Sequence, residues 1–395
     1  MTGPIYLDHN ASTPIDPAVI DRICWAMQTF VGNASSVDHA FGHAAHAAIE
    51  EARGTIADHL GARASDLVFT SGATEANNIA VRGAFRAAKA EGRTRVVTAS
   101  TEHPSVLETV RSLEAEGAQV VVLPVDENGQ IDLNELAQTL SAQTALVTIM
   151  AANNETGVIH PVADIAALCV RASVPFHSDM TQYAAHMPVN LATVGVTLAS
   201  FSGHKLYGPK GVGVLFARSR RPRARLDTIW TGGGQERGTR PGTLNTEGIL
   251  GLAEAVVQVR QWLKDPDELE AMKAALEARL ATISGLRMNG LKACRLPNTL
   301  NVSIEGIDPL ALQHRLRERL VFSTGSACST EKVQASPVLT AMFGECERAR
   351  NGFRLGLGRG TTWEEVEQAA VLIHEAVGHL RNGAIGLAQT TSAVL

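Results

Sequence analysis

Short apolar runs rich in β-branched residues recur through the first part of the 395-residue chain and predict β-strands. Stretches with helical spacing separate most of these runs, for example His43–Leu60, which Gly61 is expected to end, and Ser105–Glu116. Strands and helices that alternate in this way indicate an α/β fold, with a mainly parallel sheet covered by helices on both faces. The predicted strands of this sheet are Asp66–Thr70, Arg95–Ala99, Val120–Leu123, Ala145–Met150, Val174–His177 and Leu198–Ser202.

The pattern changes from about Thr246, where longer helical stretches mix with isolated strand-like runs. This mixture predicts a smaller α+β domain toward the C-terminal end. We expect a large domain over residues 16–255 and a small domain made of residues 1–15 and 256–395. The elements predicted from this point on are helices at Thr246–Leu263, Asp267–Ile283, Pro309–Arg319 and Trp363–Arg381, and strands at Thr299–Ile304, Leu320–Ser323 and Gly352–Leu357.

The composition is that of an ordinary soluble globular protein, with 45% hydrophobic and 19% charged residues. The formal net charge of -5, spread without long runs of one sign, argues against direct binding of nucleic acid. The chain has no apolar run of about 18 residues, which a membrane span would need, and its first ten residues lack an apolar signal core. We therefore expect no membrane association and a cytoplasmic location.

The five cysteines are odd in number and widely scattered, which argues against a disulfide framework and against a zinc or other metal site. Cys328 lies within Ser323–Thr330, a run of small polar residues that is typical of a loop. Buried positions, as small apolar side chains, are expected instead for Cys24, Cys169 and Cys294.

Polar residues follow several predicted strands, at the edge where mainly parallel sheets bind ligands. Ser71–Glu75 follows the first strand and opens a helix, so its free backbone N–H groups and the Thr74 hydroxyl suit a phosphate. His103 follows the second strand, where an imidazole is placed to stack on a flat ring. A helix-capping role for Thr74 and an ordinary hydrogen-bonded histidine are open alternatives for these residues taken singly.

Asp179 follows another apolar strand, where a buried carboxylate needs a donating partner such as a protonated pyridine nitrogen. Lys205 lies in a glycine-bracketed turn, where desolvation favours a neutral amine that forms an imine with a carbonyl. Taken singly, a capping aspartate and a solvated lysine are equally good interpretations. Together, a phosphate cradle, a stacking histidine, a ring-nitrogen carboxylate and an imine lysine match an aldehyde cofactor with a phosphate tail.

Several segments carry a resemblance to a known family, and Ser202-Gly-His-Lys205 and Ser326-Ala-Cys328 in this order are highly specific jointly. Over nearly its whole length the chain resembles the cysteine desulfurases of the NifS/IscS type, within the class V aminotransferases. This resemblance implies a pyridoxal-phosphate-dependent transferase of fold type I, with a mainly parallel seven-stranded sheet in the large domain. The other matching segments are Tyr6-Leu-Asp-His-Asn-Ala11, Gly32-Asn33, Thr70-Ser-Gly-Ala-Thr-Glu75, Thr101-Glu-His103, Asn153-Asn-Glu-Thr-Gly157, Asp179-Met-Thr-Gln182, Gly232-Gly-Gly-Gln-Glu-Arg237, Gly242-Thr-Leu244 and Arg354.

The resemblance implies pyridoxal 5′-phosphate as the cofactor and a role for each matching residue. Lys205 is expected to carry the cofactor, and His103 to stack on its ring and to move protons. Further cofactor contacts are expected from Ala73, Thr74, Ser202 and His204 at the phosphate, Asp179 at the ring nitrogen, Gln182 at the ring hydroxyl, Asn154, and Thr243 across a dimer interface. The substrate carboxylate is expected to bind Asn33, Asn154 and Arg354.

By the same resemblance, the substrate is L-cysteine and the products are L-alanine and a persulfide on Cys328. The thiolate of Cys328 would be the nucleophile, and His103 is a candidate base for a thiol. A loop at about 323–335, carried by the small domain, suits a group that collects sulfur inside and delivers it outside. A homodimer and a separate sulfur-acceptor protein are the expected partners.

Three positions depart from the commoner pattern of this family: Met180, Tyr183 and Pro241. Met180 stands where a small residue usually lies against the cofactor, so we expect it to shift the ring or narrow the substrate range. One alternative function is that of another class V enzyme, a selenocysteine lyase or an aminotransferase, that does not rely on Cys328. A second alternative is a non-catalytic sulfur carrier or scaffold that keeps the fold.

Overall fold

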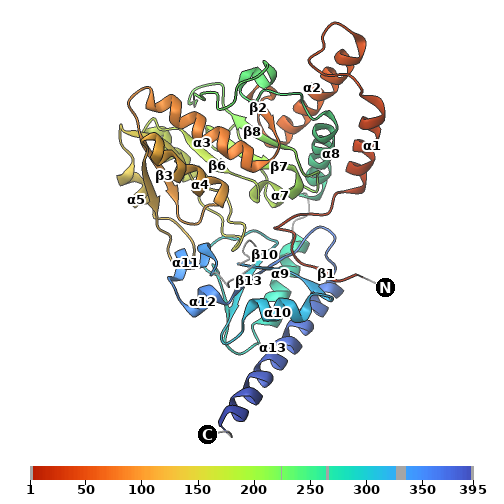
Figure 1. Ribbon diagram of the computed structural model, residues 1–395, viewed down its shortest axis with the longest axis vertical. Helices are drawn as coiled ribbons and strands as arrows, with labels where there is room; N and C mark the ends of the chain where they lie inside the picture. Colours follow the sequence, from red (N-terminus) through yellow and green to blue (C-terminus); the bar gives the residue numbers. More distant parts are fainter. Residues whose placement is uncertain (1–2, 224, 264–266, 326–334, 393–395) are drawn as a thin grey trace.

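The computed structural model describes residues 3–223, 225–263, 267–325 and 335–392, with residues 383–392 described by their backbone alone. The chain forms a larger body and a smaller body stacked along the longest axis, and the last helix projects from the smaller one (Figure 1). Cys328 lies outside the described residues.

A seven-stranded sheet in the order β2-β8-β7-β6-β5-β3-β4 forms the centre of the larger body. Strands β3 to β7 run parallel to their neighbours, whereas β8 is antiparallel to both β7 and β2. The predicted mainly parallel sheet is thus confirmed, with strand ends that differ from the predicted ones by at most two residues. The strands are β2 (Leu67–Thr70), β3 (Arg95–Ala99), β4 (Gln119–Leu123), β5 (Thr144–Thr148), β6 (Phe176–Asp179), β7 (Leu198–Ser202) and β8 (Gly213–Ala217).

Helices cover both faces of this sheet because side chains alternate along each strand. Leu67 and Phe69 enter one apolar core together with residues of α2, α6 and α8. Val68, between them, enters a second core with residues of α3 and α4 on the other face. The helices of the larger body are α1 (Pro17–Thr29), α2 (Ala40–Leu60), α3 (Ala73–Lys89), α4 (Pro104–Ser112), α5 (Leu133–Thr139), α6 (Val162–Arg171), α7 (Tyr183–His186) and α8 (Thr246–Trp262).

Local signals account for several helix ends. The carboxylate of Asp16 accepts a hydrogen bond from the backbone of α1, which begins at a proline. Gly61 ends α2 with a left-handed φ of 59°, as predicted. The sequence pattern missed α1, a helix of which only Val19 and Ala26 are buried.

The smaller body has an antiparallel sheet in the order β12-β13-β10-β9, beside a two-stranded sheet of β1 and β11. Ile5 and Leu7 belong to the core of this body, although they begin the chain. The exact division at residues 15/16 and 255/256 stays a prediction. The elements are β1 (Ile5–Tyr6), α9 (Asp267–Leu280), β9 (Leu286–Met288), β10 (Thr299–Ile304), α10 (Pro309–Leu316), β11 (Leu320–Val321), β12 (Ser323–Thr324), α11 (Pro337–Phe343), α12 (Glu347–Arg350), β13 (Gly352–Gly356) and α13 (Trp363–Ser392), which extends past its predicted end.

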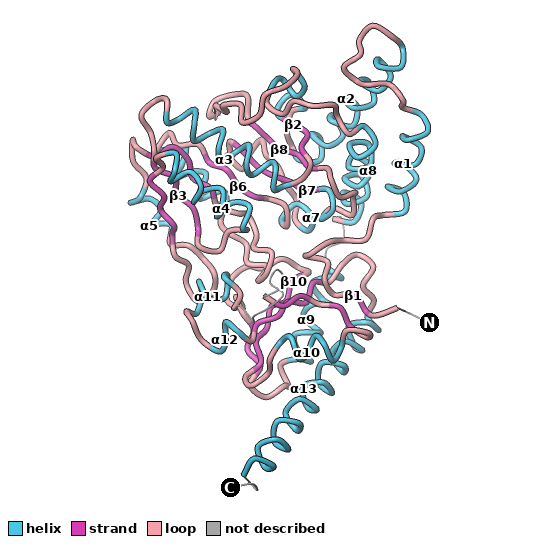
Figure 2. Tube along the Cα trace, viewed as in Figure 1, coloured by secondary structure: helices cyan, strands magenta, loops and turns pink. Residues whose placement is uncertain are grey.

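The N-terminal segment crosses from the smaller body to the larger one and touches both. Leu7 is fully buried in the smaller body, whereas both the backbone N–H and the hydroxyl of Thr13 donate to the carbonyl of His204 in the larger one. Loops meet between the two sheets at this level (Figure 2). Residues 8–12, all polar except Ala11, are therefore held at the junction where the strand-end loops converge.

The described cysteines only partly match expectation. Cys169 is buried on α6, as predicted, but Cys24 and Cys294 are exposed, so the prediction of burial was wrong for both. Cys24 lies on the weakly buried α1, and Cys294 lies in the loop before β10. Within the described ranges, no group of three or more histidine, cysteine or acidic side chains is arranged to hold a metal ion. No helix in those ranges is both long and apolar enough to cross a bilayer.

Candidate active site

A cleft of about 1070 Å³ lies at the carboxyl ends of the parallel strands, with walls from both bodies. The loop Ser71–Glu75 lines it from the larger body, and Gly352–Arg354 lines it from the smaller one. The structure therefore brings together most of the residues predicted for the site, namely Ala73, Thr74, His103, Asn154, Asp179, Gln182, Ser202, His204, Lys205 and Arg354.

The start of α3 forms the end of the cleft that suits a phosphate. Gly72 is the N-cap residue, and its φ of 151° is one that glycine readily adopts. No side chain of the cap accepts a hydrogen bond from the first turn of this 17-residue helix. Gly213 of β8 packs closely against Gly72: a methyl group added to Gly213 would lie only 2.6 Å from the Gly72 Cα. An anion at this position meets free N–H groups and the positive end of the helix dipole.

Glu75, in the same turn, connects this end of the cleft to the segment that precedes Thr243. Its carboxylate accepts from the Ser71 backbone N–H at 2.5 Å and from Arg240 Nε at 2.7 Å. Burial alone would raise the pKa of Glu75, but the hydrogen bonds from Arg240 and Ser71 hold it below its ordinary value. The negative charge beside the phosphate end is thus neutralised by a cation.

Asp179 and Gln182 form the middle of the cleft, each held by defined partners. The two oxygens of the buried Asp179 accept from Asn77 Nδ2 at 2.8 Å and from the Thr181 N–H at 3.0 Å. Gln182 Nε2 donates to the Asn10 carbonyl at 2.9 Å. Both side chains therefore have defined orientations in the cleft before any ligand arrives.

Lys205 has the perturbed amine that the sequence predicts. Its Nζ donates to the Asn10 carbonyl at 2.6 Å. Desolvation is the main cause that lowers the pKa of Lys205 to about 8, and the charge of Arg354 adds to the effect. The carboxylates of Asp8 and Asp179 act in the opposite direction. A substantial share of this amine is therefore neutral, and nucleophilic, near pH 8.

His103 lies at the mouth of the cleft and also caps α4. The Ser105 N–H donates to His103 Nδ1 at 3.1 Å, so the ring is tied to the start of the helix. Desolvation lowers the pKa of His103 although Asp179 opposes it, and the charge of Lys205 lowers it further. The ring is consequently neutral at physiological pH.

Arg354 lies at the opposite end of the cleft, on β13, with a side chain that is 9% exposed. Its guanidinium donates to the Asn154 carbonyl at 2.8 Å, to Asp8 at 2.7 Å and to Ser323 Oγ at 2.9 Å. Its Nε has no hydrogen-bond partner among the residues that the structure describes. The guanidinium is thus held in place while one of its donors stays available for a carboxylate.

Some predicted residues do not meet in this cleft. Asn33 and Thr243 are both exposed and line no part of it in the single chain. Cys328 lies outside the described residues, but Gly325 and Ala335, the described residues nearest to it in sequence, both line the cleft. The placement of these three predicted residues relative to the cofactor stays a prediction.

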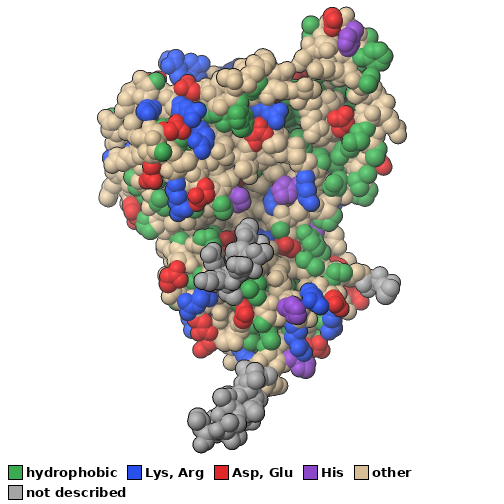
Figure 3. Space-filling model, viewed as in Figure 1, with side chains coloured by type: hydrophobic (Ala, Val, Ile, Leu, Met, Phe, Trp, Pro, Cys, Tyr) green, Lys and Arg blue, Asp and Glu red, His purple; other side chains and the backbone are tan. Residues whose placement is uncertain are grey.

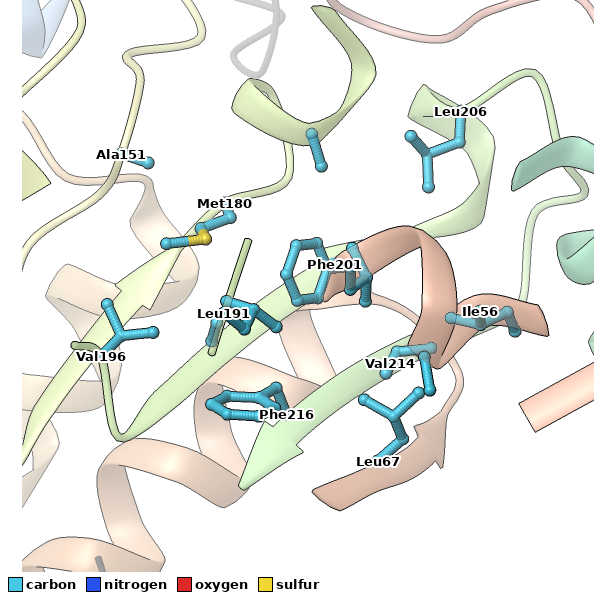
Figure 4. Packing of buried hydrophobic residues seen from close by; sticks show 14 of the residues in the cluster. Ile56, Leu67, Ala151, Met180, Leu191, Val196, Phe201, Leu206, Val214 and Phe216 are labelled. Carbon is cyan, nitrogen blue, oxygen red and sulfur yellow. The ribbon is translucent and has the colours of Figure 1, made fainter. Parts of the chain in front are cut away.

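Met180 points away from the cleft, so the expectation that it presses on the cofactor is wrong. Its side chain is 2% exposed and lies in the core among residues that include Leu191 and Phe201 (Figure 4). Asp179 and Thr181, its two neighbours, line the cleft, whereas Met180 does not. Successive side chains at the end of β6 alternate between the cleft and the core.

Sequence reasoning assigned no role to Asp8, Asn10 and Asn77, which hold the predicted site residues. Asp8 pairs with Arg354, and Asn77 donates to Asp179. The signal available for Asp8 and Asn10 was their place in Tyr6-Leu-Asp-His-Asn-Ala11, one of the segments that carry the resemblance. The only sequence signal for Asn77 was that it is a polar residue in the helix predicted to begin after Gly72.

Comparison with known proteins bears on what this cleft binds. The sequence pattern of the Aminotransferase class-V family matches residues 5–369. This chain belongs to that family. It is 41% identical to Cysteine desulfurase IscS of Rickettsia bellii (strain OSU 85-389) over 383 residues, which cover 96% of this chain and 92% of that protein. The resemblance to cysteine desulfurases is thereby confirmed.

Solved structures agree with this class V assignment. A NifS-like protein has a TM-score of 0.88 at 33% identity, covering 95% of this chain and 100% of its own. SspA in complex with cysteine has a TM-score of 0.79 at 34% identity, covering 90% of this chain and 99% of its own. The predicted fold type I architecture is therefore confirmed.

The cleft of this class V chain fits pyridoxal 5′-phosphate, the cofactor of the family. The uncapped start of α3 suits the phosphate, and the two-donor setting of the buried Asp179 leaves a carboxylate for a protonated ring nitrogen. Lys205, with its pKa lowered to about 8, offers the amine that such an aldehyde requires. The cofactor of this protein is pyridoxal 5′-phosphate.

Proposed function

We propose that this protein is a cysteine desulfurase that takes sulfur from L-cysteine, releases L-alanine and holds the sulfur as a persulfide on Cys328. The observation that carries the proposal is one cleft that contains both an amine of pKa about 8, Lys205, and a buried guanidinium, Arg354. The similar Rickettsia bellii protein is named a cysteine desulfurase, and the similar SspA structure contains cysteine.

Each residue in the middle of the cleft has a defined task in this proposal. Bound pyridoxal phosphate supplies an electron sink that makes the bonds of the substrate α-carbon easier to break. Lys205 attaches the cofactor and, as a free amine, takes the proton of the α-carbon. Asp179 accepts from the ring nitrogen, Gln182 faces the ring hydroxyl, and His103 stacks on the ring.

The phosphate is held by the first turn of α3, through Ala73 and Thr74, together with Ser202 and His204. Burial lowers the pKa of His204 to about 4, and the charges of Lys205 and Lys210 act in the same direction. His204 is therefore neutral and contributes a hydrogen bond and no charge. Thr243 would complete this end of the cleft from a partner subunit.

The substrate carboxylate binds Arg354, with Asn154 and Asn33 as further contacts in the proposal. Arg354 Nε has no hydrogen-bond partner among the described residues, so the guanidinium keeps a donor for a carboxylate. This contact places the α-carbon of an amino acid between Arg354 and Lys205. Cys328 would then attack the substrate sulfur as a thiolate: the S–S bond forms as the substrate Cβ–S bond breaks, and the electron pair of that bond stays on the carbon, which takes a proton to become alanine.

Two adducts test the assignment. Borohydride reduction of the holoenzyme should fix the cofactor on Lys205, and mass spectrometry after cysteine treatment should find one added sulfur on Cys328. A Cys328→Ser variant should keep the visible absorption of the cofactor but lose sulfide release, whereas Cys294→Ser, which alters an exposed cysteine, should keep both. Unchanged sulfide release from Cys328→Ser would favour a lyase or aminotransferase, and a colourless protein would favour a scaffold.

We also infer a homodimer. An exposed apolar surface gathers over α1 and the start of α2, at the upper right of Figure 3. A group of exposed apolar side chains on one surface is typical of a contact with another protein. Thr243, which is proposed to reach the phosphate of a partner subunit, is exposed in the single chain. Sedimentation should give twice the chain mass, and Met27→Glu combined with Phe41→Glu should give the monomer. The exposed residues of this surface are Ile20, Trp25, Met27, Val31, Val37 and Phe41.

A sulfur-acceptor protein and a cytoplasmic place of action complete the proposal. The described cysteines Cys24, Cys169, Cys294 and Cys346 are all free, which a reducing compartment favours. Acidic and basic side chains are intermixed on the face shown in Figure 3, without the basic stripe typical of nucleic-acid binding. Capture of proteins that receive labelled sulfur from the persulfidated enzyme in cell extract would identify the acceptor.

A further inference from the structure

A chain of hydrogen bonds connects His103 to Asp179 through two residues that have no assigned role. His103 Nδ1 lies 2.8 Å from Ser105 Oγ, and Asn77 Nδ2 lies 2.8 Å from the same hydroxyl. Asn77 Nδ2 also lies 2.8 Å from Asp179 Oδ2. The chain passes from the start of α4 through the fully buried Asn77 on α3 to the end of β6.

The direction of every bond in this chain follows from which groups can donate. Asp179 as a carboxylate only accepts, so the amide nitrogen of Asn77 must face it; the reverse orientation would set two acceptors against each other. The second N–H of Asn77 then donates to Ser105 Oγ. The hydroxyl hydrogen of Ser105 is left to donate to His103 Nδ1.

His103 Nδ1 receives a second donor as well, the backbone N–H of Ser105 at 3.1 Å. A nitrogen that faces two donors carries a lone pair and no hydrogen. The hydrogen of the neutral ring is therefore on Nε2, toward the cleft. Protonation of Nδ1 would set its new hydrogen against both donors, which disfavours the imidazolium form.

We propose that Asn77 and Ser105 are positioning residues that hold His103 as the neutral Nε2–H tautomer. In this state His103 is a hydrogen-bond donor to the cleft, and it has no lone pair available there to accept a proton. The base for an incoming substrate thiol is then a different group. This outcome differs from the proton-moving role that the family resemblance implies for His103.

The pKa of His103 supports the same state. Desolvation lowers it, and of the two charged groups that face the ring, Asp179 raises it and Lys205 lowers it. The hydrogen-bond chain adds a geometric reason for the neutral form that does not depend on these charges. The inference rests on the proposed place of His103 and Asp179 at the cofactor.

The tautomer can be read directly by NMR on the substrate-free holoenzyme labelled with nitrogen-15 in its histidine rings. Two-bond nitrogen–proton correlations distinguish the Nε2–H, Nδ1–H and doubly protonated rings, and loss of one signal set in His103→Gln assigns His103. We expect the Nε2–H pattern at neutral pH. A His103 ring that is Nδ1–H or doubly protonated at that pH overturns the proposal without any need for a variant.

Asn77→Asp should reverse the direction of the hydrogen bonds between His103, Ser105 and residue 77, with almost no change in the shape of the side chain. A carboxylate at this position shares a proton with Asp179 and presents an acceptor to Ser105, whose hydroxyl then turns toward it and accepts from His103 Nδ1. The ratio of Nε2–H to Nδ1–H rings should fall by about tenfold or more, the size expected from reversing one hydrogen bond to a ring nitrogen. Adding Ser105→Ala should restore the wild-type pattern, because the connection is cut.

Asn78→Asp is the matched control, since it adds the same charge one residue further along α3 without contact to Asp179. The His103 ring of Asn78→Asp should keep the wild-type Nε2–H pattern. If Asn77→Asp also keeps the wild-type ratio of Nε2–H to Nδ1–H rings, the hydrogen bonds through Asn77 and Ser105 do not set the tautomer and the proposal is overturned. Because the spectra are recorded without cysteine, a failure of the desulfurase assignment would appear in sulfide release and not in the tautomer.

Discussion

Asp8 and Arg354, which come from opposite ends of the chain, pair at 2.7 Å, and Arg354 lines the cleft. The guanidinium expected to bind substrate is thus already held by a carboxylate of the protein. The two residues act on Lys205 with opposite signs: Arg354 adds to the desolvation that lowers its pKa, and Asp8 raises it. This pair therefore adjusts the pH at which Lys205 becomes a nucleophile.

The pH dependence of cofactor attachment should show both effects. Only the neutral amine attacks the aldehyde, so the rate at which the cofactor-free protein takes up pyridoxal phosphate should rise with pH to a midpoint near 8, well below the ordinary lysine value of 10.5. Asp8→Asn should move the midpoint to lower pH, and Arg354→Gln to higher pH. Visible absorbance at a fixed cofactor concentration measures the rate.

A matched control for this experiment is Asp58→Asn, which removes the same charge from an exposed position on α2. Its midpoint should equal that of the wild type. Shifts of the same sign in Asp8→Asn and Arg354→Gln would contradict the electrostatic account.

Arg354→Lys should weaken cysteine binding while the cofactor stays bound. Lysine keeps the charge but lacks the planar fork that grips a carboxylate. A hydrogen bond to a charged group contributes about 1.5–3 kcal/mol, so the KM for cysteine should rise by about 10- to 150-fold. Steady-state kinetics measure this, with Arg350→Lys, an exposed residue of α12, as control. An unchanged KM would remove Arg354 from the substrate site.

The buried pair of Arg53 and Glu236 should stabilise the fold strongly. Their side chains are 5% and 2% exposed and pair at 2.7 Å, and Glu236 also accepts from the Phe69 N–H at 2.7 Å. Glu236→Ala leaves the buried guanidinium of Arg53 with only the half-exposed Glu50 as a charge partner, and should lower the free energy of unfolding by about 3–5 kcal/mol. Chemical denaturation of the holoenzyme measures this change.

Glu108→Ala supplies the comparison for that loss, because it breaks the exposed pair with Arg111 and should cost less than about 1 kcal/mol. If Glu236→Ala and Glu108→Ala lower the free energy of unfolding equally, the buried pair stabilises the fold no more than an exposed one does. Glu236, in the segment before Thr243, adopts a left-handed φ of 47°, a strained conformation for this residue type.

Gly213→Ala should lower the affinity for the cofactor. The added methyl group would meet the Phe201 carbonyl at 2.5 Å and the Gly72 Cα at 2.6 Å. The loop Ser71–Glu75, proposed to hold the phosphate, would therefore have to move. Overpacking of this kind costs about 1–3 kcal/mol, which corresponds to roughly a 5- to 150-fold weaker binding of pyridoxal phosphate. Titration of the cofactor-free protein measures the affinity.

Gly54→Ala is the control for Gly213→Ala, because a methyl group there meets no atom within 4 Å. As an alanine within α2 it should leave cofactor affinity unchanged and slightly raise stability. Wild-type affinity in Gly213→Ala would contradict this prediction, because it would show that the position of the loop Ser71–Glu75 does not determine how tightly the cofactor binds.

Local patterns in the sequence were sufficient for much of this protein. Apolar runs predicted the strands of the large sheet to within two residues, and Gly61 marked the end of α2, because strand burial and a left-handed helix end each depend on neighbouring residues. The residues after those strands predicted the cofactor cleft, since parallel strands bring their carboxyl ends to one edge.

Tertiary structure alone decided how those residues are held and which way they face. Asp8 reaches Arg354 across 346 positions of the chain, and Asn77 reaches Asp179 across 102, so neither contact leaves a local pattern. Met180 turned into the core and Cys24 to the surface because the packing of whole helices and sheets decides which side of an element is covered. Sequence periodicity describes one element at a time, whereas hydrogen-bond partners and burial depend on the elements that fold against it.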